Sequence, residues 1–299
     1  QNHDIDNVLD LKVIKEAKDV IKGTKRSIQI NKLIKNTDRS FGAMLSGDIA
    51  KKFGHKGLNE DSIIINLSGT AGQSFGTFLS KGVTLNLNGE ANDYVGKGLS
   101  GGRIIVKPFS NSKITSHRNI IIGNTVLYGA IAGECFFSGV AGERFAVRNS
   151  GAIAVVEGTG DHCCEYMTGG VIMVLGETGV NFGAGMSGGI AYVYDKEDNF
   201  SSKCNFSMVE TQKIDKGDSD SFNNIFNKFS FLDSDELRIK ELLTRHTNYT
   251  NSSRSRFILN NFDEEIKYFV KVLPIDFKKA IESKKLENLK AGKDVLWEK

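Results

Sequence analysis

The feature that most constrains the fold is a glycine-rich hexad, G-x-G-x-x-G, which occurs twice in the sequence. One copy spans 96–101 and the other spans 183–188. Each is followed by a β-branched run, Arg103–Lys107 in the first case and Ile190–Tyr194 in the second. A dinucleotide-binding loop has the same spacing, but it needs a helix after the glycines, whose N–H groups hold the pyrophosphate. Strands in that place favour structural turns, and a nucleotide site is the alternative.

The hexads are part of a longer repeat. Segment 63–82 aligns with 83–102, and segment 152–170 aligns with 171–189, so that glycines recur in step along the chain. A period of about 20 residues, made of short strands and glycine turns, is the signature of a β-solenoid whose stacked coils share one core. Glycine is needed where the backbone turns with positive φ, and where neighbouring coils leave no room for a Cβ atom. The composition, with 32 glycines against two prolines, agrees with this interpretation.

The repeat divides the chain into three parts, which together are expected to make one structural domain. Residues 1–60 form an α-rich segment covering one open end of the solenoid, residues 61–195 form the glycine-rich solenoid, and residues 196–299 form an irregular connection with C-terminal helices. The polar stretch 217–230 is interpreted as a loop insertion. Apolar periodicity predicts a strand over 27–33 and helices over 8–22, 41–53, from 233 onward, 252–272 and 277–289.

Charge and hydropathy exclude several partners. A net charge of +3, with no basic stripe interleaved with aromatic residues, argues against nucleic acid. The apolar runs are too short to cross a bilayer, and the N-terminus has no signal-peptide pattern, so we expect no membrane partner. The four cysteines, which lack C-x-x-C spacing, are expected to be reduced in an intracellular protein of the cytoplasm or a plastid. They are Cys135, Cys163, Cys164 and Cys204.

One short segment, Asp161-His162-Cys163-Cys164-Glu165, concentrates reactive side chains. It could suggest a Cys–His nucleophile or a metal site. Neighbours in a strand point to opposite faces, so these side chains, the two cysteines included, would not converge on one substrate or ion. A second cluster with zinc-ligand spacing is also missing from the sequence. We therefore expect a structural turn here, and we expect no catalytic, cofactor-binding or metal-binding residues in the chain.

A second polar group, Glu143, Arg144, Arg148 and Asn149, lies in the less regular middle of the repeat. Arginines and carboxylates beside a solenoid turn can form internal ion pairs or bind a neighbouring domain. Internal pairing is favoured here, and the interface role is the alternative. The remaining histidines are isolated and are expected to be solvated or packed. They are His3, His55, His117 and His246.

Several of these segments closely resemble the C-terminal domain of the glutamate synthase large chain. The resemblance extends from Leu9 to about Lys279. One polypeptide of the formylmethanofuran dehydrogenase complex shares the glycine turns, but not the flanking helices. Two features depart from the family pattern, Cys163 and the insertion 217–230. The motifs that carry the resemblance are Asn36–Ser40, Gly69–Gly76, Ala91–Arg103, Ala141–Gly151, Gly160–Gly170, Met186–Tyr194 and Phe269–Pro274.

The resemblance implies a right-handed parallel β-helix flanked by N- and C-terminal helices. It also implies a non-catalytic fragment of an oxidoreductase that makes L-glutamate from L-glutamine and 2-oxoglutarate. Its partners would be the amidotransferase and FMN synthase domains of the same polypeptide, and it would position them. The family's amidotransferase domain begins with a cysteine, whereas this chain begins at Gln1, so we expect that domain to be missing here.

The cofactors implied for the parent enzyme lie outside this segment. They are FMN, an iron–sulfur cluster, and NAD(P)H or ferredoxin as electron donor. Two alternatives remain from the sequence. One is a nucleotide- or flavin-binding oxidoreductase domain, which requires helices after Gly101 and Gly188. The other is a free-standing protein related to the glycine-rich polypeptide of formylmethanofuran dehydrogenase.

Overall fold

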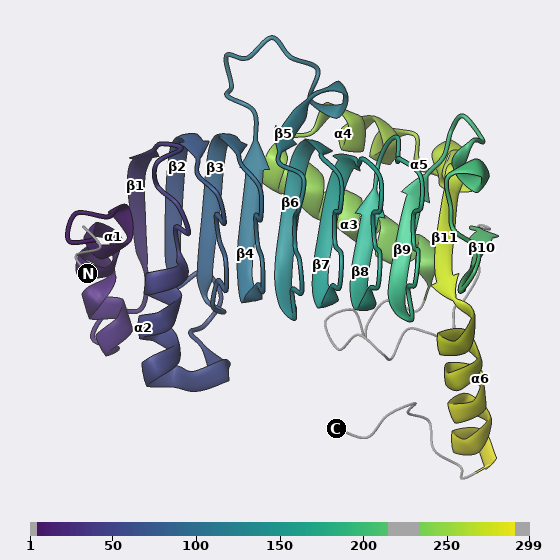
Figure 1. The fold of residues 1–299 in the computed structure, drawn as a ribbon, viewed down its shortest axis with the longest axis horizontal. Helices are drawn as coiled ribbons and strands as arrows, with labels where there is room; N and C mark the ends of the chain where they lie inside the picture. The colour runs from purple at the N-terminus through teal and green to yellow at the C-terminus, as the bar shows by residue number, and fades with distance from the viewer. Residues whose placement is uncertain (1–4, 215–233, 291–299) are drawn as a thin grey trace.

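The computed structural model describes residues 5–214 and 234–290 and shows a mainly β protein (Figure 1). A β-solenoid of about seven turns forms its centre, with helices at both ends and along one face. The strands are β1 (Ile28–Ile34), β2 (Ile63–Ala71), β3 (Val83–Ala91), β4 (Ser100–Lys107), β5 (Ile120–Ile122), β6 (Ala132–Ala141), β7 (Ser150–Gly158), β8 (Thr168–Val174), β9 (Gly188–Tyr194), β10 (Val209–Lys213) and β11 (Phe269–Pro274). The helices are α1 (Leu9–Lys22), α2 (Ala43–Phe53), α3 (Asp235–Thr250), α4 (Ser253–Asn260), α5 (Phe262–Glu265) and α6 (Ile275–Lys290).

The stacking of the strands confirms the repeat. Strands β1, β2, β3, β4, β6, β7, β8 and β9 pair in parallel in that order. Ile63 lies opposite Val83 and Asn66 opposite Asn86, as the sequence alignment predicts. Bulges interrupt the later ladders where glycines recur, for example between Thr168 and Val171 on β8. The solenoid architecture is therefore as predicted, and its right-handed sense stays a prediction.

The stack begins one strand earlier than the repeat suggested. Strand β1 pairs with β2 along its whole length, starting with Ile28 opposite Ile63. The 20-residue period is hidden here because α2 is inserted between the two strands. Helix α1 covers β1 with its buried face, so the exposed backbone of the first coil is closed off at that end. The predicted helices over 8–22 and 41–53 are thus confirmed, while the division into three parts remains a prediction.

The two halves of the solenoid differ in how their strands are buried. Strand β2 alternates buried and partly exposed residues, which is the pattern of a strand with one face in the core. All seven residues of β9 are buried. Helix α3 crosses the outer face of β6–β9 and forms a second hydrophobic layer there (Figure 1). The continuous apolar runs of the second half follow from this cover, because those strands have a core on each side.

The C-terminal segment corrects one prediction. The helical run expected over 252–272 is instead two short helices, α4 and α5, followed by strand β11. Strand β11 pairs antiparallel with β9 and with β10, so these two strands close the far end of the stack. Its phenylalanine and valines favour an extended strand, and β11 covers the edge of β9, which would otherwise be unpaired. Strand β10 also lies within the connection that was expected to be irregular.

Two further boundaries can be compared with the sequence. Helix α3 starts at Asp235, and the Ser234 hydroxyl accepts a hydrogen bond from the Leu237 N–H, so Ser234 is the N-cap. The last helix, α6, contains the predicted 277–289. The insertion 217–230 lies outside the described residues. None of the helices within 5–214 and 234–290 is long and apolar enough to cross a bilayer.

The hexads are followed by strands in both cases. Strand β4 begins at Ser100 and strand β9 begins at Gly188. The helix that a dinucleotide-binding loop requires is therefore not formed, and the interpretation of the hexads as nucleotide sites is wrong. Their glycines serve the turn instead, since Gly96, Gly98, Gly183 and Gly185 all have φ between +60° and +69°.

Candidate functional site

The turns on one side of the solenoid share an unusual backbone, with left-handed residues at every second position. In one such turn, Arg144, Ala146 and Arg148 have φ of +59°, +58° and +56°. Their N–H groups bond alternately to the two neighbouring coils: Arg144 N–H to Asp161 O, Ala146 N–H to Val126 O, and Arg148 N–H to Glu165 O. These hydrogen bonds offset the conformational strain of the left-handed residues. Ala146 is buried while both arginines are exposed, so each turn displays its first and fifth side chains.

Side chains from successive turns gather on this side into one surface, which we call the Tyr–Arg face. Its members are Tyr94, Tyr128, Arg144, Arg148 and Tyr166. They line a shallow groove of about 450 Å³ that crosses the coils. Tyr166 is 54% exposed and Tyr94 is 39% exposed. Tyrosine and arginine are the residue types enriched at protein interfaces, so the composition of this face is that of a docking surface.

The second glycine of the G-x-G pair has a specific role next to this face. A Cβ atom added to Gly98 would come within 2.6 Å of the Phe78 ring, and one added to Gly185 within 2.5 Å of the Tyr166 ring. Each glycine therefore makes room for an aromatic ring of the preceding coil. The exposed aromatic residues and the glycine spacing are parts of one structural device.

The expectation of internal ion pairs for Glu143, Arg144 and Arg148 is wrong. All three are exposed, and none forms an ion pair with another described residue. The left-handed turn is the reason, because it directs the two arginines away from the coils. Asn149 differs, since it is fully buried and its amide donates to Ala152 O and Gly169 O, both at 3.0 Å. Asn149 is thus a structural residue.

The segment Asp161–Glu165 forms the equivalent turn one coil later, rather than a strand. His162 and Cys164 are left-handed. Both cysteines are buried in the core with their sulfur atoms 3.7 Å apart, whereas opposite faces were expected. Burial raises the pKa of the Cys164 thiol well above its ordinary value, which disfavours a nucleophilic thiolate. Asp161 accepts the Val180 N–H at 2.8 Å, which is a turn-stabilising contact.

The other titratable groups of the sequence analysis lie in different places. His55 is exposed, His117 is partly buried, and His3 lies outside the described residues. Among the described residues, no group of three or more histidine, cysteine, aspartate or glutamate side chains could hold a metal ion. Burial raises the pKa of the Cys135 thiol well above its ordinary value and that of Cys204 to about 12.

Sequence reasoning missed the buried polar contacts that fasten the C-terminal helices to the solenoid, among them a cluster around Glu157 and another around Asp235. In the first, Glu157 on β7 accepts hydrogen bonds from His246 Nε2 at 3.3 Å and from the Ser252 hydroxyl. Burial raises the pKa of Glu157, but the interactions with His246 and the Ser252 hydroxyl outweigh burial, so the pKa lies below its usual range. His246, which appeared isolated in the sequence, is completely buried in this cluster.

The second cluster joins α3 to β9 and β11. Asp235 accepts from the Tyr192 hydroxyl, from Arg238 at 3.0 Å and from Lys271 at 2.9 Å. Arg238 and Lys271 are at most 1% exposed. Their positions are far apart in the sequence, and the only local signal is the Asp-x-x-Arg spacing at the start of α3.

Together, the parallel stack and the glycine turns define a β-solenoid domain with an exposed face of aromatic and basic residues. Within that class, the chain belongs to the GXGXG motif family, which matches residues 10–275. It is 49% identical, over 94% of its length, to glutamate synthase [NADH] of Schizosaccharomyces pombe. It is 46% identical, over 98% of its length, to the glutamate synthase [NADPH] large chain of Bacillus subtilis. It is 40% identical, over 89%, to the chloroplastic ferredoxin-dependent glutamate synthase of Spinacia oleracea.

The chain corresponds to only one segment of these relatives. It spans 13% of the S. pombe protein, 18% of the B. subtilis protein and 16% of the spinach protein. The relatives differ in electron donor, which their names give as NADH, NADPH or ferredoxin.

Proposed function

We propose that this chain is the solenoid region of a glutamate synthase large chain, where it positions the amidotransferase and FMN synthase domains and performs no chemistry itself. The proposed parent enzyme makes L-glutamate from L-glutamine and 2-oxoglutarate. Its FMN, iron–sulfur cluster and electron-donor site would belong to other parts of the polypeptide. A location in the cytoplasm or a plastid follows from the same proposal. The likeness to one segment of several glutamate synthases supports this proposal.

The Tyr–Arg face is the observation that carries the docking role. Arg144 and Arg148 are exposed on a rigid backbone, and the described residues offer them no carboxylate partner. A planar guanidinium presents five donors in a fixed fork, which suits a carboxylate on a neighbouring domain. Tyr94, Tyr128 and Tyr166 add apolar area between them. Such a surface would contact the catalytic domains of the same polypeptide.

The burial pattern supports a role as a rigid spacer. Strands β6–β9 have one hydrophobic core inside the solenoid and a second one under α3. Bending the stack would have to open both cores at once, and close-packed interiors resist such changes. A rigid connection would keep the site that releases ammonia in register with the site that uses it.

The test uses the full-length protein that carries this chain, with Arg144→Glu and Arg148→Glu. If the face holds the catalytic domains in register, glutamine hydrolysis should run ahead of glutamate formation in both variants. The measurement is the ratio of glutamine consumed to 2-oxoglutarate consumed. Arg26→Glu is the matched control, because Arg26 is exposed before β1 and does not line the groove. An unchanged ratio in Arg144 and Arg148 variants that fold normally would refute the docking role.

A further inference from the structure

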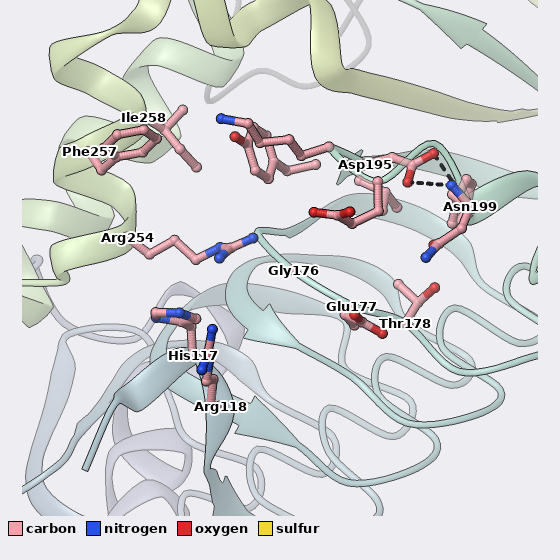
Figure 2. A pocket seen from close by; sticks show the side chains of 15 residues that line it. His117, Arg118, Gly176, Glu177, Thr178, Asp195, Asn199, Arg254, Phe257 and Ile258 are labelled. Carbon is pink, nitrogen blue, oxygen red and sulfur yellow. Dashed lines mark hydrogen bonds between the residues drawn. The ribbon is translucent and has the colours of Figure 1, made fainter.

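A cleft of about 310 Å³ lies where the strands β8 and β9 end, on a different side from the Tyr–Arg face. Its walls come from three segments that are far apart in the sequence (Figure 2). These are the 3₁₀ turn Ser116–Arg118, the turns that follow β8 and β9, and helix α4. The volume is in the range of small-molecule sites. The proposed docking role makes no use of this cleft.

Two guanidinium groups and an imidazole lie at one end of the cleft. Figure 2 shows Arg118, His117 and Arg254 gathered there, with Arg254 extending from α4 and the other two rising from the 3₁₀ turn. Arg254 Nε donates to Leu175 O, and its guanidinium carbon lies 5.4 Å from the centre of the Tyr194 ring. This leaves its terminal nitrogens without a partner among the described residues. The Arg118 side chain likewise has no hydrogen-bonded or ionic partner there.

The carboxylates of the cleft are mostly used elsewhere. Asp195 accepts the N–H groups of Asn199 and Phe200 at 3.0 and 3.1 Å. Glu177 lies 3.3 Å from Lys203. Glu197, which also lines the cleft, is exposed at its rim and forms no ion pair within the described residues. Glu157 and Glu177 lie close enough to act on the Arg254 charge, but no described carboxylate forms a direct ion pair with Arg118 or Arg254.

The pKa of Arg254 reflects mainly its burial. Burial lowers this pKa below the ordinary value and the nearby Arg118 charge also lowers it, while Tyr194, Glu157 and Glu177 oppose the change. A bound anion would reduce the electrostatic repulsion between the guanidinium groups of Arg118 and Arg254. His117 Nδ1 and Thr178 Oγ1, in the cleft walls, are buried without a hydrogen-bond partner in the described part of the chain, and the Thr178 side chain is more than nine-tenths buried.

The buried Glu157 fixes the two arginines in place. It binds the hydroxyl of Ser252, the N-cap of α4, which lies two residues before Arg254. Ser116, two residues before Arg118, also lowers the Glu157 pKa, so the 3₁₀ turn lies close to the same carboxylate. A completely buried group on β7 thus orients both segments. This preorganisation reduces the entropy that a ligand would lose on binding.

We propose that this cleft binds the oxyanion group of a small organic molecule, a phosphate or a carboxylate, between the guanidinium groups of Arg118 and Arg254. Paired guanidinium forks match the oxygen spacing of both anions. The volume exceeds that of an oxyanion alone, and the side chains of Val193, Phe257 and Ile258 supply an apolar wall for a carbon skeleton. This site is independent of the docking role proposed above.

The experiment is hydrogen exchange measured by mass spectrometry on the full-length protein that carries this chain. Inorganic phosphate and glutarate are added separately at millimolar concentration, with sodium chloride at matched ionic strength as the reference. Binding should slow exchange in the peptides that cover 113–121 and 250–258. If phosphate alone protects these peptides, the cleft is a phosphate site. If glutarate alone protects them, it is a carboxylate site, and if both protect them, it is a general oxyanion site. Each of these three results supports the proposal.

Two variants make the test specific. Arg118→Gln should weaken binding of whichever anion gives protection about tenfold or more, because one pair of charge-assisted hydrogen bonds is lost. Arg118 is exposed, so this change leaves the packing of the cleft intact. Arg256→Gln is the control on the same helix, since Arg256 is exposed and bonds to Asn251 instead of lining the cleft. No protection by either anion, or equal protection in Arg118→Gln, would overturn the proposal.

Discussion

Gly188 offers the sharpest test of how the coils pack. It starts β9 at a bulge, where a Cβ atom would come within 2.8 Å of the Thr168 carbonyl carbon and still nearer to its oxygen. Ordinary contacts between such atoms are about 3.5 Å, so Gly188→Ala must push two backbone segments apart by several tenths of an ångström or more. Moving these segments apart would also strain the hydrogen bond that the Gly188 N–H donates to Met167 O, at 3.2 Å.

The expected loss of stability can be worked from these two effects. Overpacking costs about 1–3 kcal/mol, and a weakened backbone hydrogen bond about 1 kcal/mol. Gly188→Ala should therefore lower the free energy of unfolding by about 2–4 kcal/mol. At about 2–4 °C per kcal/mol for a large domain, the melting temperature should fall by roughly 5–15 °C. Gly188→Val, which adds a β-branched side chain, should be worse.

Gly47 is the matched control. It lies inside α2, and an added Cβ would meet no atom within 4 Å. Gly47→Ala should stabilise by about 0.5–1 kcal/mol, because alanine loses less backbone entropy in a helix than glycine does. Thermal melts followed by circular dichroism compare the two variants with the parent chain. Equal melting temperatures for Gly188→Ala and Gly47→Ala would refute the packing argument.

Three further predictions concern the buried polar groups. The pKa of Glu157 is lower in the folded protein than in the unfolded chain, so the ionised carboxylate stabilises the fold. This contribution is complete above the unfolded pKa of about 4.3 and is lost as the pH falls through the folded pKa. Urea melts of Glu157→Gln and the parent should thus differ at pH 7 and converge in acid, and an equal gap at both pH values would contradict this. Asp235→Ala should lower the free energy of unfolding by about 3–5 kcal/mol, because it removes a negative charge that faces the buried Arg238 and Lys271. A loss below about 1 kcal/mol in the same urea melts would contradict this prediction. The buried Cys164 should react with a thiol reagent only at the rate of unfolding, and a rapid reaction of the native protein would disprove its burial.

The solenoid could be predicted because its determinants recur. Gly69 and Gly89 lie opposite each other in the structure at the spacing seen in the sequence, and a signal repeated in each coil outweighs local ambiguity. Strand β1 was predicted as a strand but not as part of the stack, because α2 interrupts the period after it. The sequence predicts helix up to 272, where the first part of β11 forms, because a strand that pairs only at the end of a stack has no repeat to identify it. Single, non-repeating elements are decided by tertiary contacts that local sequence does not contain.

The surface residues show a second limit. Arg144 and Arg148 invited an interpretation as internal ion pairs, because a sequence does not show which side of a turn a residue occupies. The deciding fact is the left-handed backbone at both positions. In the turn before β4, Gly96 and Gly98 occupy the positions of Ala146 and Arg148, and these glycines are the local sign of that conformation, which non-glycine residues conceal in the turn of Arg144.

The cluster around Asp235 explains how α3 finds a single position on the solenoid. Apart from Glu157 on β7 and the tyrosine hydroxyls of β9, the outer face of β7–β9 is apolar, and an apolar helix could slide along it with little change in buried area. Tyr192, Arg238 and Lys271 can all reach Asp235 only when α3 starts beside β9 and β11. Any displaced arrangement would leave buried charges without partners, at a cost of several kcal/mol. The apolar layer thus supplies the attraction between helix and solenoid, and the charged cluster selects the register.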